Sequence, residues 1–205
     1  MTAESLQAIL WDFDGVLMDS MPTRDRGFLE VLKDYPPYEV DALMVYHRKN
    51  GGLSRYVKFR YFFETIRNES ITDEQIQKLA ISFSAIMRSL LVNPSLLIKP
   101  AIKFVENNHL HIPMFIVSGS DQEELRFLCK EMNIASYFKG IFGSPVPKTK
   151  LVEQVLQQNN FIGSSCILIG DSINDYEAAV KNGLHFMAYN NDALKDKTTL
   201  SLGID

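Results

Sequence analysis

The chain has 205 residues, of which 46% are hydrophobic and 22% charged, and its net charge at pH 7 is −4. This length suits one large domain or one core with an insertion, and the composition is ordinary for a globular protein. A mildly acidic chain favours neither nucleic acid nor an anionic membrane as its main partner. No apolar stretch approaches the roughly 20 residues that span a bilayer, and nothing in the sequence indicates the oligomeric state.

The first predicted element is a buried strand over residues 8–11, followed by Asp12, Asp14 and Gly15. In an extended chain, residues two apart point to the same side, so both carboxylates could face one point. Gly15 would let the chain turn sharply there. Two carboxylates at one point repel each other unless a cation or a proton lies between them. They could also be solvated aspartates at an ordinary strand end.

The next stretch, from about residue 18 to 95, is predicted to be wholly helical. Four helices are expected: from Pro22 to the prolines 36–37, over 38–48, over 55–67 with Ser54 as its cap, and from a Thr72–Gln75 capping box to about Leu90. Aromatic residues recur at helical spacing in the third helix, and we interpret them as core.

From Pro100 onward, strands and helices alternate. Strands are expected over 113–117, 138–142, 166–169 and 185–188, and helices over 101–107, 120–132 with a Ser120–Glu123 capping box, 150–158 and 176–181. Gly183 is a plausible C-cap, and the tail from Asp192 is expected to be weakly structured. Such alternation is typical of a parallel sheet with crossover helices. The sequence therefore predicts an α/β fold with a Rossmann-like three-layer core (1–16 and 97–205) and an all-helical insertion (17–96).

Chemistry in an open α/β sheet gathers at the carboxyl ends of its strands. The second strand ends at Ser118 and Gly119, where a hydroxyl and the N-terminus of the next helix could bind a phosphate oxygen. Ser118 and Ser120 could equally be turn and cap residues. Asp171 and Asp175 follow the strand 166–169 and, with Asp12 and Asp14, predict a site for Mg²⁺, which prefers oxygen ligands.

A cation is needed to offset the repulsion between these carboxylates. Lys148 and Lys150 are the two candidates in the segment after residue 143. Lys148 follows two prolines and would start a helix, whereas Lys150 is expected inside that helix. We therefore favour Lys148.

These residues, in this order, resemble the four motifs of the haloacid dehalogenase-like hydrolases. The motifs are Asp12-x-Asp14-Gly-Val, Ser118 after an apolar strand, Lys148, and Gly170-Asp171-Ser-x-x-Asp175. The resemblance covers the whole chain, and the helical insertion is similar to the cap of the phosphoglycolate phosphatase and β-phosphoglucomutase branch. One departure is Lys148-Thr149, where many relatives have Lys-Pro.

The resemblance implies a Mg²⁺-dependent phosphatase of a small phosphorylated metabolite, such as a sugar phosphate. Asp12 would attack phosphorus, and Asp14 would act as acid and then base. Asp12, the Asp14 backbone carbonyl and Asp171 would hold the metal, and Asp175 would bind it through water or orient Lys148. Ser118, Gly119 and nearby N–H groups, including those of Phe13 and Asp14, would bind the phosphoryl oxygens. Dehalogenases of the family, and relatives that cleave phosphorus–carbon bonds, lack an acidic residue at the position that corresponds to Asp14, so its presence favours phosphate ester chemistry.

A phosphomutase of the β-phosphoglucomutase type is the alternative, and a non-catalytic phosphate-binding protein is a third hypothesis. The cap would supply specificity, and its candidate substrate contacts are Gly51, Gly52, Arg55 and His47. They lie in a stretch that also contains Arg48, Lys49 and Lys58. The same charges could instead belong to a solvated helix end.

The two cysteines, Cys129 and Cys166, fall in a predicted helix and a predicted buried strand. Reduced structural thiols at such positions fit a cytoplasmic protein. Residues 1–5 show no basic region followed by an apolar run, so we expect no signal peptide there.

Overall fold

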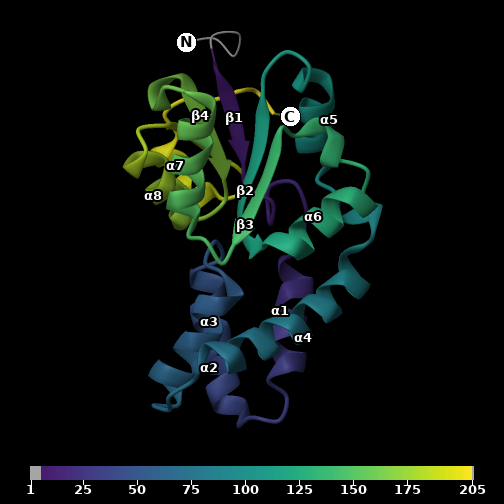
Figure 1. Cartoon of the computed structure of the whole chain (residues 1–205), viewed down its shortest axis with the longest axis vertical. Coiled ribbons are helices and arrows are strands. Elements are labelled where there is room, and N and C mark those ends of the chain that lie inside the picture. The colour runs from purple at the N-terminus through teal and green to yellow at the C-terminus, as the bar shows by residue number, and fades with distance from the viewer. Residues whose placement is uncertain (1–5, 205) are drawn as a thin grey trace.

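The computed structural model describes residues 6–204 and contains a five-stranded sheet with helices on both faces (Figure 1). Its strands are β1 (Ala8–Trp11), β2 (Met114–Asp121), β3 (Gly140–Ser144), β4 (Cys166–Gly170) and β5 (His185–Ala188). They lie in the order β3-β2-β1-β4-β5, and every neighbouring pair is parallel. The predicted parallel α/β fold is confirmed. The expectation about a signal peptide concerns residues 1–5, which lie outside the described range.

Strand β1 occupies the centre of the sheet. Trp11 pairs with Ile116 of β2 on one side and with Ile169 of β4 on the other. The chain fills the β2–β3 side first and then crosses to the β4–β5 side, so the strand order reverses beside β1. In open α/β sheets, ligands bind outside the carboxyl ends of the strands at such a reversal.

Side chains of β1 point alternately to the two faces of the sheet, and each face is covered by a layer of helices. Ile9 and Trp11 face a core that includes residues of α5 and α6, whereas Ala8 and Leu10 face a second core with residues of α7 and α8. All four side chains are fully buried. These helices are α5 (Lys99–Asn108), α6 (Gln122–Glu131), α7 (Lys148–Asn159) and α8 (Ile173–Lys181). The predicted three-layer arrangement is therefore confirmed.

The predicted helical insertion between β1 and β2 is also present. It consists of α1 (Met21–Val31), α2 (Pro37–Lys49), α3 (Arg55–Tyr61) and α4 (Asp73–Leu91), which stand beyond the carboxyl ends of the strands (Figure 1). Ser54 caps α3 and the Thr72–Gln75 capping box opens α4, both as expected. The helix expected over 55–67 is α3 followed by a π-helical turn, Phe62–Ile66. The exact division into core (1–16 and 97–205) and cap (17–96) stays a proposal.

Aromatic side chains form the centre of the cap. The Phe28 ring lies 5.4 Å from that of Phe59 and 4.6 Å from that of Phe83, measured between ring centres. Phe59 and Phe62 are fully buried. These contacts agree with the interpretation of the aromatic residues as core.

The capping box expected at Ser120 and Glu123 is wrong. Strand β2 continues through Ser120, because its pairing with β3 shifts in register between Val117 and Asp121 and keeps the backbone extended. Asp121 caps α6 instead, and its side chain accepts hydrogen bonds from the N–H groups of Glu123 and Glu124, at 3.1 and 3.0 Å. The Ser120 hydroxyl is therefore available for another partner.

The C-terminal segment is more ordered than predicted. Asp192–Lys197 forms a 3₁₀ turn, and the Thr199 N–H donates to the Phe186 carbonyl at 2.9 Å, which ties the segment to β5. Gly183, with φ +70°, follows the last turn of α8, as its C-cap prediction requires.

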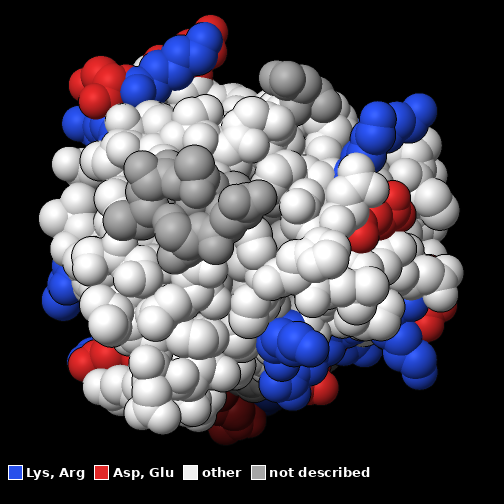
Figure 2. All heavy atoms as spheres, turned by 90° about the horizontal axis from the view of Figure 1, so that it is seen from above, with Lys and Arg blue, Asp and Glu red and all other residues white. Residues whose placement is uncertain are grey.

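Figure 2 shows the molecule from above, looking at the end of the sheet opposite to the cap. Its charged side chains stand singly or in small groups, mostly near the margin of this view. The aspartates after β1 and β4 lie at the other end of the sheet, where the cap meets the core.

Candidate active site

Asp12 and Asp14 leave β1 at the predicted place, but their carboxylates have different surroundings. Asp12 is buried, and its Oδ1 accepts a hydrogen bond from the Phe13 N–H at 2.7 Å. Its Oδ2 lies 2.9 Å from Lys148 Nζ. Both aspartates line one cavity between core and cap.

Lys148 is the cation at this site. It is the first residue of α7, and its buried ammonium pairs with Asp12 and donates a hydrogen bond to Asp175 Oδ1. Burial lowers the pKa of Lys148, but the two carboxylates outweigh this and raise it, so the side chain is charged. Lys150, the competing candidate, is exposed and pairs with Glu153.

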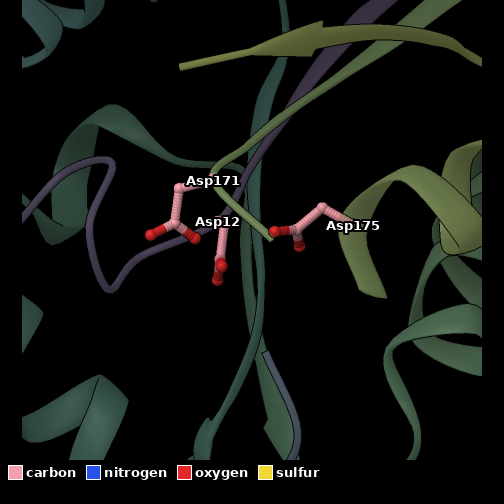
Figure 3. Close-up of side chains that lie close together, drawn as sticks. All are labelled: Asp12, Asp171 and Asp175. Carbon is pink, nitrogen blue, oxygen red and sulfur yellow. The ribbon is translucent and has the colours of Figure 1, made fainter. Parts of the chain in front are cut away.

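Asp12, Asp171 and Asp175 converge from β1, β4 and α8 (Figure 3). One carboxylate oxygen from each lies within 4.8 Å of the others. Burial, followed by the charge of Asp175, raises the pKa of Asp12 well above its usual range and that of Asp171 to about 7. Such mutual repulsion fits a divalent cation at this point, and the all-oxygen donor set suits Mg²⁺.

The three carboxylates are not equivalent. Both oxygens of Asp175 already have donors, since Lys148 bonds Oδ1 while the Ser172 N–H and hydroxyl bond Oδ2 at 3.0 and 2.7 Å. Asp171 lies against Gly15, where a Cβ atom would stand 2.1 Å from Asp171 Oδ2. Asp175 thus has three donors, whereas Asp12 has two, the Phe13 N–H and Lys148, so Asp175 has the least capacity left for a metal. This favours Asp175 as the residue that orients Lys148 and leaves Asp12 and Asp171 as the better candidates for direct metal ligands.

The Asp14 carboxylate is held by three side chains. Oδ1 accepts from Ser20 and from Arg24 Nε, the latter at 2.6 Å, and Oδ2 accepts from the Ser120 hydroxyl at 2.5 Å. Burial alone would raise the pKa of Asp14, but the Arg24 charge and these hydrogen bonds lower it. Asp14 is thus ionised here. The structure gives Ser120 a contact with Asp14 in place of the predicted cap role.

Ser118 and Gly119 lie inside the last part of β2, which runs on to Asp121 and does not end at Val117 as expected, and both line the cavity. Ser118 is buried and its Oγ accepts from the Ser120 N–H at 3.1 Å. Gly119 abuts the cap, because a Cβ there would stand 2.3 Å from the Gly52 carbonyl oxygen. The cap loop at 51–52 thus rests directly on the predicted phosphate-binding segment.

The predicted substrate contacts of the cap, Gly51, Gly52, Arg55 and His47, all line this cavity. Arg55 and His47 are buried, so these two side chains do not belong to a solvated helix end, and their contact with substrate stays a prediction. Arg48 and Lys49, by contrast, are exposed. The cavity has room of about 30 Å³, enough for two or three water molecules.

Sequence reasoning missed Arg24, Glu124 and the role of Ser120. Arg24 contacts Asp14 and Glu124, and Glu124 also contacts Arg55. One local signal existed for Glu124, because its spacing places it on the same face of α6 as the buried Leu125, Leu128 and Cys129. A buried ionic residue needs a partner, but the sequence does not name a partner 100 residues away.

Comparison with known proteins identifies the family. Residues 9–189 match the family described as haloacid dehalogenase-like hydrolase. The chain therefore belongs to the haloacid dehalogenase-like hydrolases, and the resemblance inferred from its motifs is confirmed.

Two curated relatives are phosphatases by name. The phosphorylated carbohydrates phosphatase of Thermotoga maritima is 23% identical over 186 residues, which cover 87% of this chain and 82% of that protein. The phosphoglycolate phosphatase of Neisseria gonorrhoeae is 23% identical over 192 residues, covering 88% of this chain and 78% of that protein.

Among solved structures, CbbY from Rhodobacter sphaeroides in complex with xylulose-(1,5)bisphosphate has a TM-score of 0.73. It is 14% identical, and the match covers 97% of this chain and 91% of that one. A haloacid dehalogenase-like hydrolase from Bacteroides fragilis has a TM-score of 0.72 at 18% identity, covering 91% and 89%. These similarities establish the fold.

Proposed function

We propose that this chain is a Mg²⁺-dependent phosphatase that hydrolyses a small phosphorylated metabolite through an aspartyl phosphate on Asp12. One observation carries the proposal: the buried Asp12 carboxylate lies 2.9 Å from Lys148 Nζ and shares a cavity with Asp14, Ser118 and Asp171. A binding protein has no need of a nucleophile, a second carboxylate and a charged lysine together. This arrangement therefore supports hydrolysis over binding alone.

In the first step, Asp12 attacks phosphorus and the bond from phosphorus to the ester oxygen breaks. Asp14 gives its proton to the departing oxygen. In the second step, Asp14 takes a proton from water, whose oxygen attacks phosphorus and releases phosphate from Asp12. Splitting a very slow hydrolysis into two displacements lowers each barrier.

Asp14 must be protonated before the first step, although the charge of Arg24 and the hydrogen bonds to its carboxylate lower its pKa. A phosphate ester brings negative charge beside it, and like charge raises the pKa of a carboxyl group. Ser20, Arg24 and Ser120 would keep the carboxyl oriented while it gains and loses the proton.

Other residues of the site would stabilise charge. Lys148 offsets the negative charge around the reacting phosphoryl group, and the Ser118 hydroxyl is a donor for one of its oxygens. Asp12, Asp171 and the Asp14 backbone carbonyl would hold Mg²⁺. When bound, the ion would neutralise phosphoryl charge and keep Asp12 ionised.

The proposed substrate is a sugar phosphate or a similar phosphate monoester. Support comes from the relatives named as phosphatases of phosphorylated carbohydrates and of phosphoglycolate. The place of action is proposed to be the cytoplasm, in keeping with two buried, unpaired cysteines. Among residues 6–204, no helix combines the length and apolar character needed to cross a membrane.

A screen of phosphate esters, with Mg²⁺ and with chelator, tests the proposal. The wild-type protein should release phosphate only with the metal, and Asp12→Asn should abolish release without loss of folding. Asp41→Asn, an exposed position on α2, is the matched control and should retain full activity. Release of phosphate by Asp12→Asn would refute the nucleophile. Isomerised ester without net phosphate release would indicate a phosphomutase.

A further inference from the structure

Glu124 is a fully buried carboxylate that belongs to the core but contacts two arginines of the helical insertion. Its Oε1 accepts from Arg24 Nη1 at 3.0 Å, and its Oε2 accepts from Arg55 Nη1 at 2.7 Å. One carboxylate thus holds two guanidinium groups from α1 and α3. The reaction proposed above assigns no role to Glu124.

Both arginines keep one terminal nitrogen that has no partner in the described part of the chain. Arg24 donates Nε to Asp14 and Nη1 to Glu124, while Arg55 donates Nη1 to Glu124 and to Ser84 Oγ at 2.6 Å. Within residues 6–204, the Nη2 atoms of Arg24 and Arg55 are buried and have no hydrogen-bond acceptor. The two side chains belong to residues that are 6% and 4% exposed, and both line the cavity. Buried donors of this kind call for an acceptor.

Lys58 adds a third donor to the same wall. Its Nζ lies 2.8 Å from His47 Nδ1 and donates to the Gly51 carbonyl at 3.2 Å, so its ammonium form has one further proton to donate. Burial, followed by the charge of Arg24, lowers the pKa of Lys58 to about 7, and an anion bound beside it would raise that pKa and favour the ammonium form. Burial, followed by the charge of Lys58, lowers the pKa of His47 to about 3, so its ring is neutral and its Nδ1 can accept from Lys58. Lys58 is buried and lines the cavity.

We propose that Glu124 is a positioning residue that holds Arg24 and Arg55 so that their free nitrogens, together with Lys58, bind a second anionic group of the substrate. This inference rests on the proposed phosphatase function and narrows its substrate to a phosphate monoester that also carries a carboxylate or a second phosphate. Guanidinium groups suit both anions, because their paired N–H donors match two oxygens.

The position of Arg24 limits the length of such a substrate. Its Nε contacts Asp14, the residue proposed to protonate the ester oxygen, so its free Nη2 lies close to the leaving group. The second anionic group therefore stands within a few bonds of the ester oxygen. On the cap side of the cavity stand three basic side chains, Arg24, Arg55 and Lys58, whereas the cavity's carboxylates, Asp12, Asp14 and Asp171, come from the core side. A second anionic group would therefore be attracted to the cap side.

Binding of three two-carbon esters tests the inference. Phosphoglycolate, ethylene glycol bisphosphate and ethylene glycol monophosphate differ only in a terminal carboxylate, phosphate or hydroxyl. Calorimetric titration into Mg²⁺-loaded Asp12→Asn protein should give a Kd about tenfold lower for the two anion-bearing esters. The lower Kd of phosphoglycolate or of ethylene glycol bisphosphate then shows whether the site prefers a carboxylate or a phosphate. Equal Kd values for all three would overturn the proposal.

Glu124→Gln, made in the same Asp12→Asn protein, tests the positioning role. It keeps the side-chain shape and removes the charge, and the preference for anion-bearing esters should fall to less than about threefold. Glu123→Gln on the exposed side of α6 is the matched control and should keep the preference. An unchanged preference in Glu124→Gln would refute the role of Glu124. If that variant unfolds, Glu124→Asp, which retains the charge with shorter reach, should show an intermediate preference, and a wild-type preference there would refute the role.

These measurements separate the two proposals. Hydrolysis is followed in parallel with wild-type protein on the same esters. Phosphate release without any preference for a second anion would leave the phosphatase function standing and overturn this inference. Preferential binding of the anion-bearing esters with no phosphate release from any ester would support the anion site and refute the phosphatase function.

Discussion

Gly15 is a glycine for two reasons, a positive φ angle and the closeness of the Asp171 carboxylate, and Gly15→Ala tests them. Gly15 has φ +78°, which costs a residue with a side chain about 1–2 kcal/mol. The added Cβ would also stand 2.1 Å from Asp171 Oδ2, whereas ordinary contact begins at 3.4 Å, so this oxygen must retreat by about 1.3 Å. Mg²⁺ requires oxygen ligands at about 2.0–2.1 Å, so such a displacement should weaken Mg²⁺ binding about 10- to 100-fold.

Gly183→Ala is the matched control for this substitution. Gly183 has nearly the same backbone angle, φ +70°, but no atom of residues 6–204 beyond its chain neighbours lies within 4 Å of the point that its Cβ would occupy. Both variants should lose about 1 kcal/mol of unfolding free energy in urea denaturation, since they share the backbone penalty. Only Gly15→Ala should need more Mg²⁺ for half-maximal phosphate release. Equal Mg²⁺ requirements in the two variants would refute the assigned position of Asp171.

Further predictions concern charge at the site and in the cap. Lys148→Met leaves the buried carboxylates of Asp12 and Asp175 without their cation, so it should cost about 3 kcal/mol or more of unfolding free energy and most of the activity. The exposed Lys150→Met is the control and should change the unfolding free energy by less than about 0.5 kcal/mol. Similar losses in the two variants would contradict the pairing of Lys148. Because the pKa of Asp171 is about 7, protons should compete with Mg²⁺, and the apparent Kd for Mg²⁺ should rise about tenfold from pH 8 to pH 6; a constant Kd would contradict this. Burial, followed by the charge of Lys58, lowers the pKa of His47 to about 3, so its stabilising contribution is complete above pH 6.5, its unfolded value, and falls by about 2 kcal/mol between pH 7 and pH 5. Urea denaturation of His47→Gln should show a correspondingly smaller acid loss than wild type, and an identical loss would refute the low pKa.

The residues at the strand ends could be found from the sequence because local signals mark them. Apolar runs that stop at Asp12, Ser118 and Asp171 predict strand ends, and parallel strands bring their carboxyl ends to one edge. Lys148 could be chosen over Lys150 because a proline pair fixes where α7 begins. The fold and the central carboxylates therefore follow from patterns that span a few residues each.

The surroundings of Asp14 could not be found in this way. Because residues two apart in a strand point to the same side, the Asp14 carboxylate is expected beside that of Asp12. In the structure it accepts hydrogen bonds from Ser20, Arg24 and Ser120 instead. The contact of Arg24 with Glu124 joins residues 100 apart, and it depends on α4, which packs against both α1 and α6. Contacts of this kind depend on the complete tertiary structure, which local periodicity does not encode.

The partners of Asp14 set a limit on exchanging caps between relatives. Ser20 and Arg24 lie inside the proposed cap segment, 17–96, whereas Ser120 lies in the core. A graft that replaces the whole segment to change substrate preference would also remove Ser20 and Arg24, two of the three side chains that bind the Asp14 carboxylate. A chimaera should therefore join after α1, so that substrate choice can be transplanted while the proton-transfer residue keeps its native support.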